Sequence, residues 1–458
     1  MKLVPALIAL VPLALGPLTL IQAADYDPNS FGGSPTPIGA GARSLGMGGA
    51  FVAIADDATA NTWNPAGMTQ LERPEASLTA GYSRRRTESA AGVVTQDDLG
   101  VDHVSVVLPF HVGCQQTVGL AWQRQFDFTK GIAFSTTQTD ESGFSTDTRT
   151  TAIDQEGGFA TLGLSYAIEP ISGLSFGATL FDWDDDHTFG SSYDKSIARR
   201  TVSQFDLGSG PEARTTLDSQ TQTEVAVERG LSTVLGVWWQ ATSQVTVGMA
   251  LKPRYRLHLV SEERSRERQL EEDLTTDPST VTGESTTLST STSRTTLVYP
   301  TSATLGTAIR FGDMTTISLD ATWTKWDEYR SEGAAGSTSP LNVDVAPSDY
   351  RDGWSFRVGL ERIIPFERIV LVPRCGALYE ESPGVSEAPD LVDAGTVHAR
   401  IDRYYGATAG LSLFQESFIV DAAVQLRLAN GVAGENAPPN ESTDVRAIAA
   451  RLSLAYLF

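Results

Sequence analysis

The sequence predicts an all-β membrane protein: a 14-stranded antiparallel transmembrane β-barrel with a small, partly helical N-terminal plug in its lumen. Three observations support this prediction. The chain ends on Phe458, after a stretch in which apolar residues alternate with small or polar ones. It begins with a segment typical of exported proteins. Between the ends, alternating stretches recur with turn residues between them, and a period of two indicates strands with one apolar face.

Residues 1–24 have the pattern of a signal peptide. Met1 and Lys2 give a basic start, residues 3–21 are mostly apolar, and Ala23 or Ala24 provides a small residue for cleavage. A membrane-spanning helix is the alternative, but prolines interrupt the apolar stretch. No other stretch reaches the roughly 20 apolar residues of a transmembrane helix. An exported chain that enters a membrane therefore enters as a barrel, which predicts the bacterial outer membrane, with its lipid as the surroundings.

Residues 75–458 are expected to form the barrel. An even number of strands is what a barrel with both chain ends in the periplasm requires. Short turns alternate with long connections, as periplasmic turns and outer loops do. The fourteen predicted strands are 75–86, 100–110, 115–128, 156–167, 172–185, 224–240, 243–260, 295–311, 314–329, 351–364, 366–381, 400–413, 416–430 and 443–458.

The two faces of these strands differ in polarity. In residues 354–361, large apolar residues alternate with polar residues and glycine, so the first set should face lipid and the second the lumen. An Arg or Lys on the lipid face near the bilayer midplane would cost about 2–4 kcal/mol. The alternation therefore predicts five cations that face the lumen: Lys252, Arg254, Arg256, Arg357 and Arg374.

Composition limits the possible partners. A net charge of −22 without a basic cluster argues against nucleic acid. Hydrophobic residues make up 41% of the 458 residues, which is low for this length and fits strands with one face on a polar lumen. The sequence leaves open whether its two cysteines, Cys114 and Cys375, pair. We expect a monomer with no cofactor and no bound metal.

Residues 25–74 lack strand alternation and are expected to form the plug. Asp56 or Asp57 can cap a short helix, and Asn64 followed by Pro65 is a strong start for another. A compact piece of about fifty residues before a barrel is most simply placed inside it. The glycine-rich run of this segment suits close backbone packing, and its candidate plug glycines are Gly46, Gly48 and Gly49.

The chain resembles the FadL/TodX family of outer-membrane transporters for long-chain fatty acids and other hydrophobic compounds. The likeness rests on GARSLGMGGAFVAIADDATANTWNPAG, on DGWSFRVGLE at 352–361 and on LVPRCGALYEESP at 371–383, and it covers essentially the whole mature chain. The resemblance implies fourteen strands and an N-terminal hatch. Its most specific element is the plug motif, Asn64, Pro65, Ala66 and Gly67.

The resemblance also implies a route for the substrate. The outer loops would catch fatty acids or aromatic hydrocarbons, an apolar pocket would hold them, and a gap beside a kinked third strand would release them sideways into the membrane. That strand corresponds to residues 118–128 here. The candidate gap residues are Gln123, Gln125, Phe126 and Phe128.

Two features depart from this pattern. The predicted loops 186–223 and 261–294 are rich in Ser, Thr, Glu and Arg, so no apolar capture groove is evident in them. The GMGGAFVAIADDA form also resembles a PorV-like branch of the same superfamily, which is associated with protein secretion. A shared barrel can carry different cargo. The second hypothesis is therefore an accessory or structural barrel that docks exported proteins or surface partners.

Several chemical motifs favour structural interpretations. Residues 173–177 match the GxSxG nucleophile motif, but alternation continues as strand where that motif needs a helix. The plug glycines lack the spacing and the Lys-Ser/Thr ending of a phosphate loop. An acidic cluster could hold a divalent cation, although a solvated loop is the favoured interpretation: Asp182, Asp184, Asp185, Asp186 and His187. We therefore expect no enzyme activity.

The predicted lumen cations leave two interpretations open. A fatty acid carboxylate in a low-dielectric lumen needs a charged partner, which any of them could provide. Alternatively, they pair across the lumen with Glu361, Asp320 or Asp421 and fix the plug in place. The leading functional hypothesis is passive transport of hydrophobic molecules, with fatty acids as the first candidates.

Overall fold

The structure is a computed structural model that describes most of the chain. The described residues are 37–458 without 90–91, 140–143, 207–210, 277, 334–335, 342–344, 388–396 and 433–442. The predicted signal peptide and the start of the predicted plug, residues 25–36, lie outside them.

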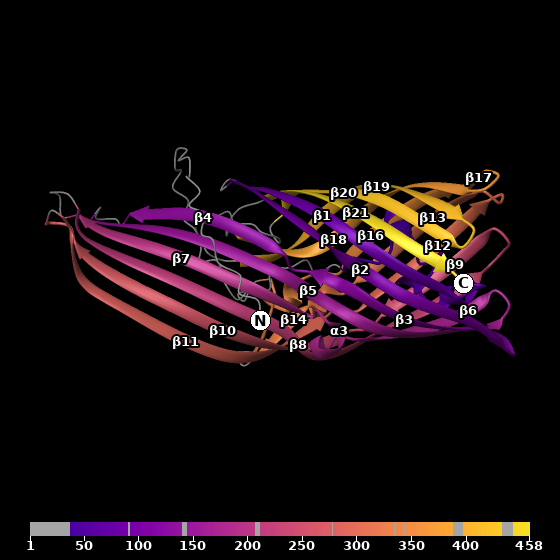
Figure 1. Ribbon diagram of the computed structural model, residues 1–458, viewed down its shortest axis with the longest axis horizontal. Coiled ribbons are helices and arrows are strands. Elements are labelled where there is room, and N and C mark those ends of the chain that lie inside the picture. Colours follow the sequence, from indigo (N-terminus) through magenta and orange to yellow (C-terminus); the bar gives the residue numbers. More distant parts are fainter. Residues whose placement is uncertain are drawn as a thin grey trace.

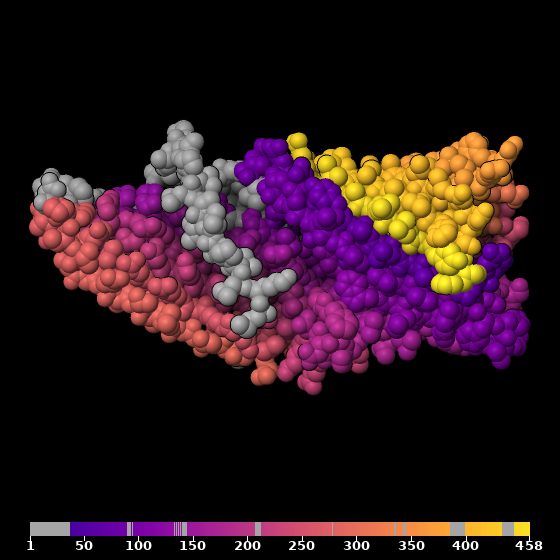
Figure 2. Space-filling model, in the orientation of Figure 1, coloured from indigo at the N-terminus to yellow at the C-terminus, as the bar shows by residue number. Residues whose placement is uncertain are grey.

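Fourteen strands form a closed antiparallel ring (Figure 1). The ring closes where β21 pairs with β1, from Glu75 opposite Leu457 to Glu88 opposite Asp444. Figure 2 shows the two chain ends of the barrel side by side, yellow against indigo. In ring order the strands are β1 (Glu75–Ser89), β2 (Gly92–Val112), β3 (Cys114–Asp127), β5 (Ser145–Ile171), β6 (Leu174–Asp182), β8 (Pro211–Gln240), β9 (Val245–Lys252), β12 (Ser302–Phe311), β13 (Thr315–Thr324), β16 (Gly353–Arg362), β18 (Val370–Glu387), β19 (Val397–Gln415), β20 (Phe418–Val432) and β21 (Thr443–Leu457). Each predicted strand overlaps one of them, which confirms the predicted number.

The predicted division into two faces is also confirmed. In β16, Trp354 and Phe356 are 45% and 51% exposed on the outside of the ring, while Ser355 between them and Glu361 further along the strand are buried. The same alternation places Val424 outside and Asp421 inside on β20. Apolar side chains facing outward on strand after strand form the surface that lipid would cover.

An extension of the same sheet continues the barrel wall beyond one end of the ring. It is made of the outer halves of β5 and β8 and four strands that lie largely outside the ring: β4 (Lys130–Thr139), β7 (Ser192–Asp206), β10 (Tyr255–Asp273) and β11 (Thr280–Tyr299). Its order is β4, β5, β7, β8, β10, β11. We call it the outer sheet; it forms the long extension at the left of Figure 1.

The outer sheet corrects the predicted loops. Residues 186–223 and 261–294 were expected as irregular loops, but most of them form β7, β8, β10 and β11. Their Ser, Thr and charged residues suit strands with water on an exposed face, where apolar alternation is not required. The remaining described elements are short: α3 (Asp185–Thr188), η2 (Trp326–Glu328), β14 (Arg330–Gly333), β15 (Gly336–Thr338), η3 (Pro347–Asp349) and β17 (Ile364–Pro365).

Prolines divide two of the predicted strands. The stretch 243–260 ends as a ring strand at Lys252 and resumes as β10 at Tyr255, after Pro253. Similarly, 295–311 is divided at Pro300 into the end of β11 and β12. Proline cannot donate a ladder hydrogen bond, so a continuous central strand is disfavoured at both positions.

The N-terminal segment, residues 37–74, packs against the inner faces of strands on different sides of the ring. It holds three short helices, α1 (Ala42–Gly46), α2 (Ala60–Trp63) and η1 (Pro65–Gln70). The Ala42 amide donates to the Ser453 hydroxyl at 2.8 Å, and the Phe51 amide donates to the Asp320 carboxylate at 2.8 Å. From the opposite wall, the Trp238 indole donates to the Ala53 carbonyl at 2.9 Å.

Inward-facing glycines make room for this segment. They form three directly opposed pairs on neighbouring strands: Gly177 with Gly236, Gly248 with Gly306, and Gly359 with Gly376. A β carbon at any of the six would lie within 3.0 Å of an atom of the N-terminal segment. The backbone of the segment therefore approaches the wall more closely than any side chain would allow.

Within the described residues, no helix is long and apolar enough to cross a membrane. Cys114 and Cys375 are both free thiols, so the question of their pairing is answered.

Replacing Gly248 by Ala should loosen the N-terminal segment. The added methyl group would meet the Val52 carbonyl, and such overpacking costs about 1–3 kcal/mol. We expect faster cleavage of the segment by protease in the purified protein, with barrel migration on unheated gels retained. Gly131→Ala in β4 is the control, because its nearest new contact would be 3.8 Å away. Equal cleavage of the two variants would contradict the close packing.

Candidate functional site

The barrel wall is incompletely paired between β2 and β3. Their pairing runs from Val112 opposite Cys114 to His103 opposite Gln123 and stops there. Further outward, β2 pairs with β1 only and β3 with β5 only, among the described residues. We call the unpaired stretch between residues 92–102 of β2 and residues 124–127 of β3 the seam.

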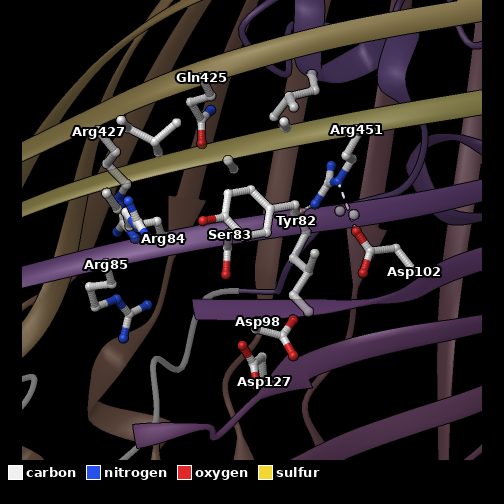
Figure 3. A pocket seen from close by; sticks show the side chains of 18 of the residues that line it. Tyr82, Ser83, Arg84, Arg85, Asp98, Asp102, Asp127, Gln425, Arg427 and Arg451 are labelled. Carbon is white, nitrogen blue, oxygen red and sulfur yellow. Dashed lines mark hydrogen bonds and ion pairs between the residues drawn. The ribbon is translucent and has the colours of Figure 1, made fainter. Parts of the chain in front are cut away.

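Side chains bridge the seam where backbone hydrogen bonds are missing. The Arg124 guanidinium of β3 contacts two carboxylates of β2, at 2.6 Å from Asp98 and 2.9 Å from Asp102. Arg451 of β21 holds Asp102 from the other side at 3.1 Å and also donates to the Ile38 carbonyl at 2.6 Å. Figure 3 shows Asp102 facing Arg451. The seam is thus closed by ion pairs that also contact the N-terminal segment.

A cavity of about 220 Å³ lies beside the seam. The residues of the seam form one wall, and Leu45 and Trp63 of the N-terminal segment contribute to its lining. The facing wall comes from β16, β18 and β20, with Arg357, Glu380 and Arg427. Glu380 lies 2.9 Å from Arg427 and 3.8 Å from Arg357. The cavity therefore combines apolar surface with arginines and carboxylates, and Arg357 and Arg427 are the guanidinium groups of the facing wall. Figure 3 shows Arg427 and Gln425 on the side opposite Asp98 and Asp127.

An aromatic cluster continues outward from the seam. The Phe126 and Tyr299 rings stack with centroids 4.7 Å apart, and Tyr299 stacks on Tyr255 at 5.0 Å. Burial raises the pKa of the Tyr329 hydroxyl far above its ordinary value, so that side chain stays uncharged. The buried members of the cluster are Phe126, Phe128, Phe159, Trp183, Tyr193, Val225, Val227, Leu257, Leu259, Leu297, Tyr299, Trp326, Tyr329, Val345 and Tyr350.

The four predicted gap residues lie together, at the seam and in the adjoining aromatic cluster. Phe126 and Phe128 belong to the aromatic cluster. Gln123 and Gln125 are buried, and Gln123 accepts a hydrogen bond of 2.6 Å from the Thr62 hydroxyl of the N-terminal segment. The pairing of β3 with β5 shifts register between Arg124 and Phe126. Release of substrate at these residues stays a prediction.

The five predicted lumen cations lie in different surroundings. Arg374 is buried and pairs with Glu361 at 3.0 Å and Asp421 at 3.3 Å, as the second interpretation expected. Glu361 also meets Arg43 of the N-terminal segment at 3.3 Å. Arg357 lines the cavity. Lys252 is half-buried at the end of β9.

Arg254 and Arg256 were predicted in the lumen, and this is wrong. Both are exposed, and Arg256 lies 3.8 Å from Glu332. Strand alternation inverts across Pro253, so that Leu257 and Leu259 of β10 point into the aromatic cluster and the arginines point away from it. A single period of two cannot be continued through a proline break.

The plug motif holds the N-terminal segment together and to the wall. The Asn64 side chain accepts from the Ala66 amide at 3.2 Å, which confirms the predicted cap, and donates to the carbonyls of Val52 at 2.8 Å and Val237 at 3.0 Å. Pro65 opens η1, and Ala66 and Gly67 are buried.

The three plug glycines each face a different part of the wall. Gly46 packs on Gly410 of β19, and Gly48, with φ of +67°, packs on Ala377 of β18. Gly49, with φ of +79°, lies against Arg357. Positive φ together with this close contact explains why glycine stands at positions 48 and 49.

The remaining motifs have structural roles. Ser175 of the GxSxG match lies buried in β6, where its hydroxyl contacts that of Thr69 at 2.7 Å. Asp184 caps α3, and His187 lies 2.9 Å from Asp182. In the part of the chain that the structure describes, no three His, Cys, Asp or Glu side chains converge as metal ligands do.

Only the family resemblance pointed to a gap beside the third strand; sequence reasoning missed the side chains that bridge the seam and most of the aromatic cluster. Arg124 and Asp102 sit on neighbouring predicted strands and Asp98 lies just before one of them, yet no residue pattern tells which strands lose their pairing. The cluster and the side chains packed against it come from positions up to 275 apart, such as Phe126 and Ile401. For the cluster, the only signal in the sequence was the alternation that tells which side chains of a strand face inward.

Comparison with known proteins agrees with this fold. The CymD monoaromatic hydrocarbon channel has 15% identity and a TM-score of 0.53, covering 92% of this chain and 98% of its own. A Pseudomonas aeruginosa FadL homologue has 13% identity and a TM-score of 0.55, covering 93% and 100%. The Pseudomonas putida toluene transporter TodX has 12% identity and a TM-score of 0.53, covering 92% and 98%. A search of curated protein sequences gives no match.

The family comparison is more direct. Residues 40–391 match the family described as outer membrane protein transport protein (OMPP1/FadL/TodX). The match covers well over half of the 458 residues and includes the N-terminal segment, the seam and the outer sheet. The protein therefore belongs to the OMPP1/FadL/TodX family of outer-membrane transporters of hydrophobic compounds, and its place is the bacterial outer membrane.

Proposed function

We propose that this protein carries hydrophobic small molecules, with long-chain fatty acids as the first candidates, passively into the outer membrane and releases them sideways through the seam. The observation that carries the proposal is the lost pairing between β2 and β3 beside a cavity. A wall held by Arg124 and two carboxylates can open by exchanging side-chain contacts, whereas a paired wall would have to break its backbone ladder.

The aromatic cluster supports a hydrophobic substrate. It is apolar, and Phe126 belongs both to the cluster and to the strand that borders the seam. Apolar chains and aromatic rings would both gain free energy by leaving water for such a site. The solved relatives carry titles that name monoaromatic hydrocarbons and toluene, so aromatic hydrocarbons are the second substrate class to test.

The cavity supports a carboxylate at one end of the substrate. Arg357 and Arg427 face it from one wall, with Glu380 next to both. A charged head leaving water needs a charge-assisted partner, and a guanidinium group offers two parallel donors to a carboxylate. Fatty acids fit this combination of arginines and apolar surface better than uncharged hydrocarbons do.

The N-terminal segment would act as the plug. Its links to the wall run through Asn64 and through the series Arg43, Glu361, Arg374 and Asp421. The seam ion pair at Asp102 continues through Arg451 to Ile38 of the same segment. Movement of the plug and opening of the seam would therefore be linked, and transport requires no bond chemistry.

Filling the seam tests the exit route. In Gly100→Trp the new side chain begins 3.5 Å from the Arg124 guanidinium and occupies the space beside it. We expect uptake of labelled oleate to fall close to that of cells lacking the protein, because the exit is blocked. Gly131→Trp in the outer sheet is the matched control. Full uptake by a folded Gly100→Trp protein would exclude the seam, and equal uptake with and without the wild-type protein would exclude fatty acid transport.

Truncating Asn64 tests the plug. Asn64→Ala removes a buried donor from two carbonyls, at about 1–3 kcal/mol for each group left unsatisfied. We expect higher conductance in planar bilayers and altered oleate uptake, with heat-resistant barrel mobility retained. The control is Asn61→Ala, whose side-chain amide nitrogen lacks a hydrogen-bond partner among the described residues. Loss of barrel mobility would assign Asn64 a purely structural role.

A further inference from the structure

The outer sheet ends in an open edge. From Gly283 to Thr295, β11 pairs with β10 on one side, and no described strand pairs with it on the other. Residues 284–294 are exposed on both faces, so nothing described covers this stretch from above or below. Backbone donors and acceptors that face away from β10 therefore have no strand partner among the described residues.

This edge lacks the devices that prevent pairing. Natural edge strands carry lysine, proline or a bulge that keeps other strands away. The stretch Gly283–Thr295 has neither lysine nor proline. Its register shift lies just outside, at Val281–Gly283, and β14 joins β11 only from Thr296 onward. The result is a regular strand of thirteen residues, rich in Ser and Thr, that is ready to accept a partner.

The charges of the edge identify the partner. Glu284 and Arg294 are its only charged residues, and each stands five positions from the central Ser289. When a second copy pairs antiparallel about Ser289, Glu284 of each copy lies opposite Arg294 of the other. Thr286 then meets Thr292 in the same register. Opposite charges and Thr pairs in directly opposed positions both stabilise antiparallel strands.

We propose that Gly283–Thr295 is a homophilic docking edge that binds the same edge of a second copy of this chain. The pairing adds roughly a dozen backbone hydrogen bonds. Glu284 already contacts Arg268 at 2.9 Å and Arg294 contacts Glu228 at 3.4 Å, but Glu284 and Arg294 are 53% and 69% exposed and stay accessible to the partner. At each end of the paired edge, four charges would then alternate in sign: Arg268 and Glu284 of one copy, followed by Arg294 and Glu228 of the other.

The symmetry of antiparallel pairing determines the relative orientation of the two barrels. The two-fold axis that relates antiparallel copies of one strand is perpendicular to their sheet. The outer sheet continues the barrel wall along β5 and β8, which run unbroken through both (Figure 1). Rotation about that axis therefore puts the two barrels at opposite ends of the assembly. Such a dimer joins two facing membranes, and each barrel remains a monomer within its own membrane.

Charge exchange between two vesicle populations tests this proposal. Glu284→Arg protein gives an edge with two positive charges, and Arg294→Glu protein gives one with two negative charges. We expect each variant alone to tether vesicles poorly, because like charges meet twice, and the mixture to tether at least about tenfold more. Light scattering and cross-linking of purified proteins in phospholipid vesicles measure this. Wild-type vesicles should tether with themselves.

The control pair carries the same exchange away from the edge. Glu262→Arg and Arg264→Glu alter an exposed pair on β10, 3.7 Å apart, and should leave wild-type tethering unchanged. All variants are first checked for heat-resistant barrel mobility. A mixture of the two edge variants that tethers no more than either alone would overturn the proposal, as would wild-type vesicles that do not tether. Transport does not depend on this edge, so oleate uptake should be the same in all four variants.

Discussion

The structure depends on one constraint: in lipid, each backbone N–H and C=O group must find its partner within the protein. A closed ring meets this demand, and β21 supplies the last ladder of hydrogen bonds when it pairs with β1. Every departure from full pairing must then be compensated by side chains. The seam is such a departure, and Arg124, Asp98 and Asp102 supply the contacts that the missing ladder does not.

The same ion pairs connect the wall to the interior. Asp102 lies between Arg124 in the wall and Arg451, which also holds the backbone of the N-terminal segment. A second series on the other side of the lumen joins Arg43 to Glu361 and Arg374. Buried charges of this kind contribute little net stability, yet removing one partner is costly. They fix the position of the segment more than they stabilise the fold.

Local alternation predicted the ring well and the outer sheet poorly, for one physical reason. Lipid on one face forces a period of two, so all fourteen ring strands were recognisable in the sequence. The outer sheet has water on its exposed faces, and Ser, Thr and charged residues were interpreted as loop. The predicted alternation of inward and outward residues also failed at Pro253, and Arg256, which was expected in the lumen, is exposed. Residue patterns alone could not give the seam or the aromatic cluster, because both depend on which distant strands meet. Only the family resemblance pointed to a gap beside the third strand.

The three opposed glycine pairs also constrain how the protein assembles. Residues 37–74 contact strands around the ring, and at Gly248 and Gly359 the segment lies closer to the wall than a β carbon would allow. A wall that closes around the segment, with β21 meeting β1 last, would form these contacts without threading a chain through a finished ring. Placement of the segment and closure of the ring then become one ordered event, in which the strands assemble around the N-terminal segment.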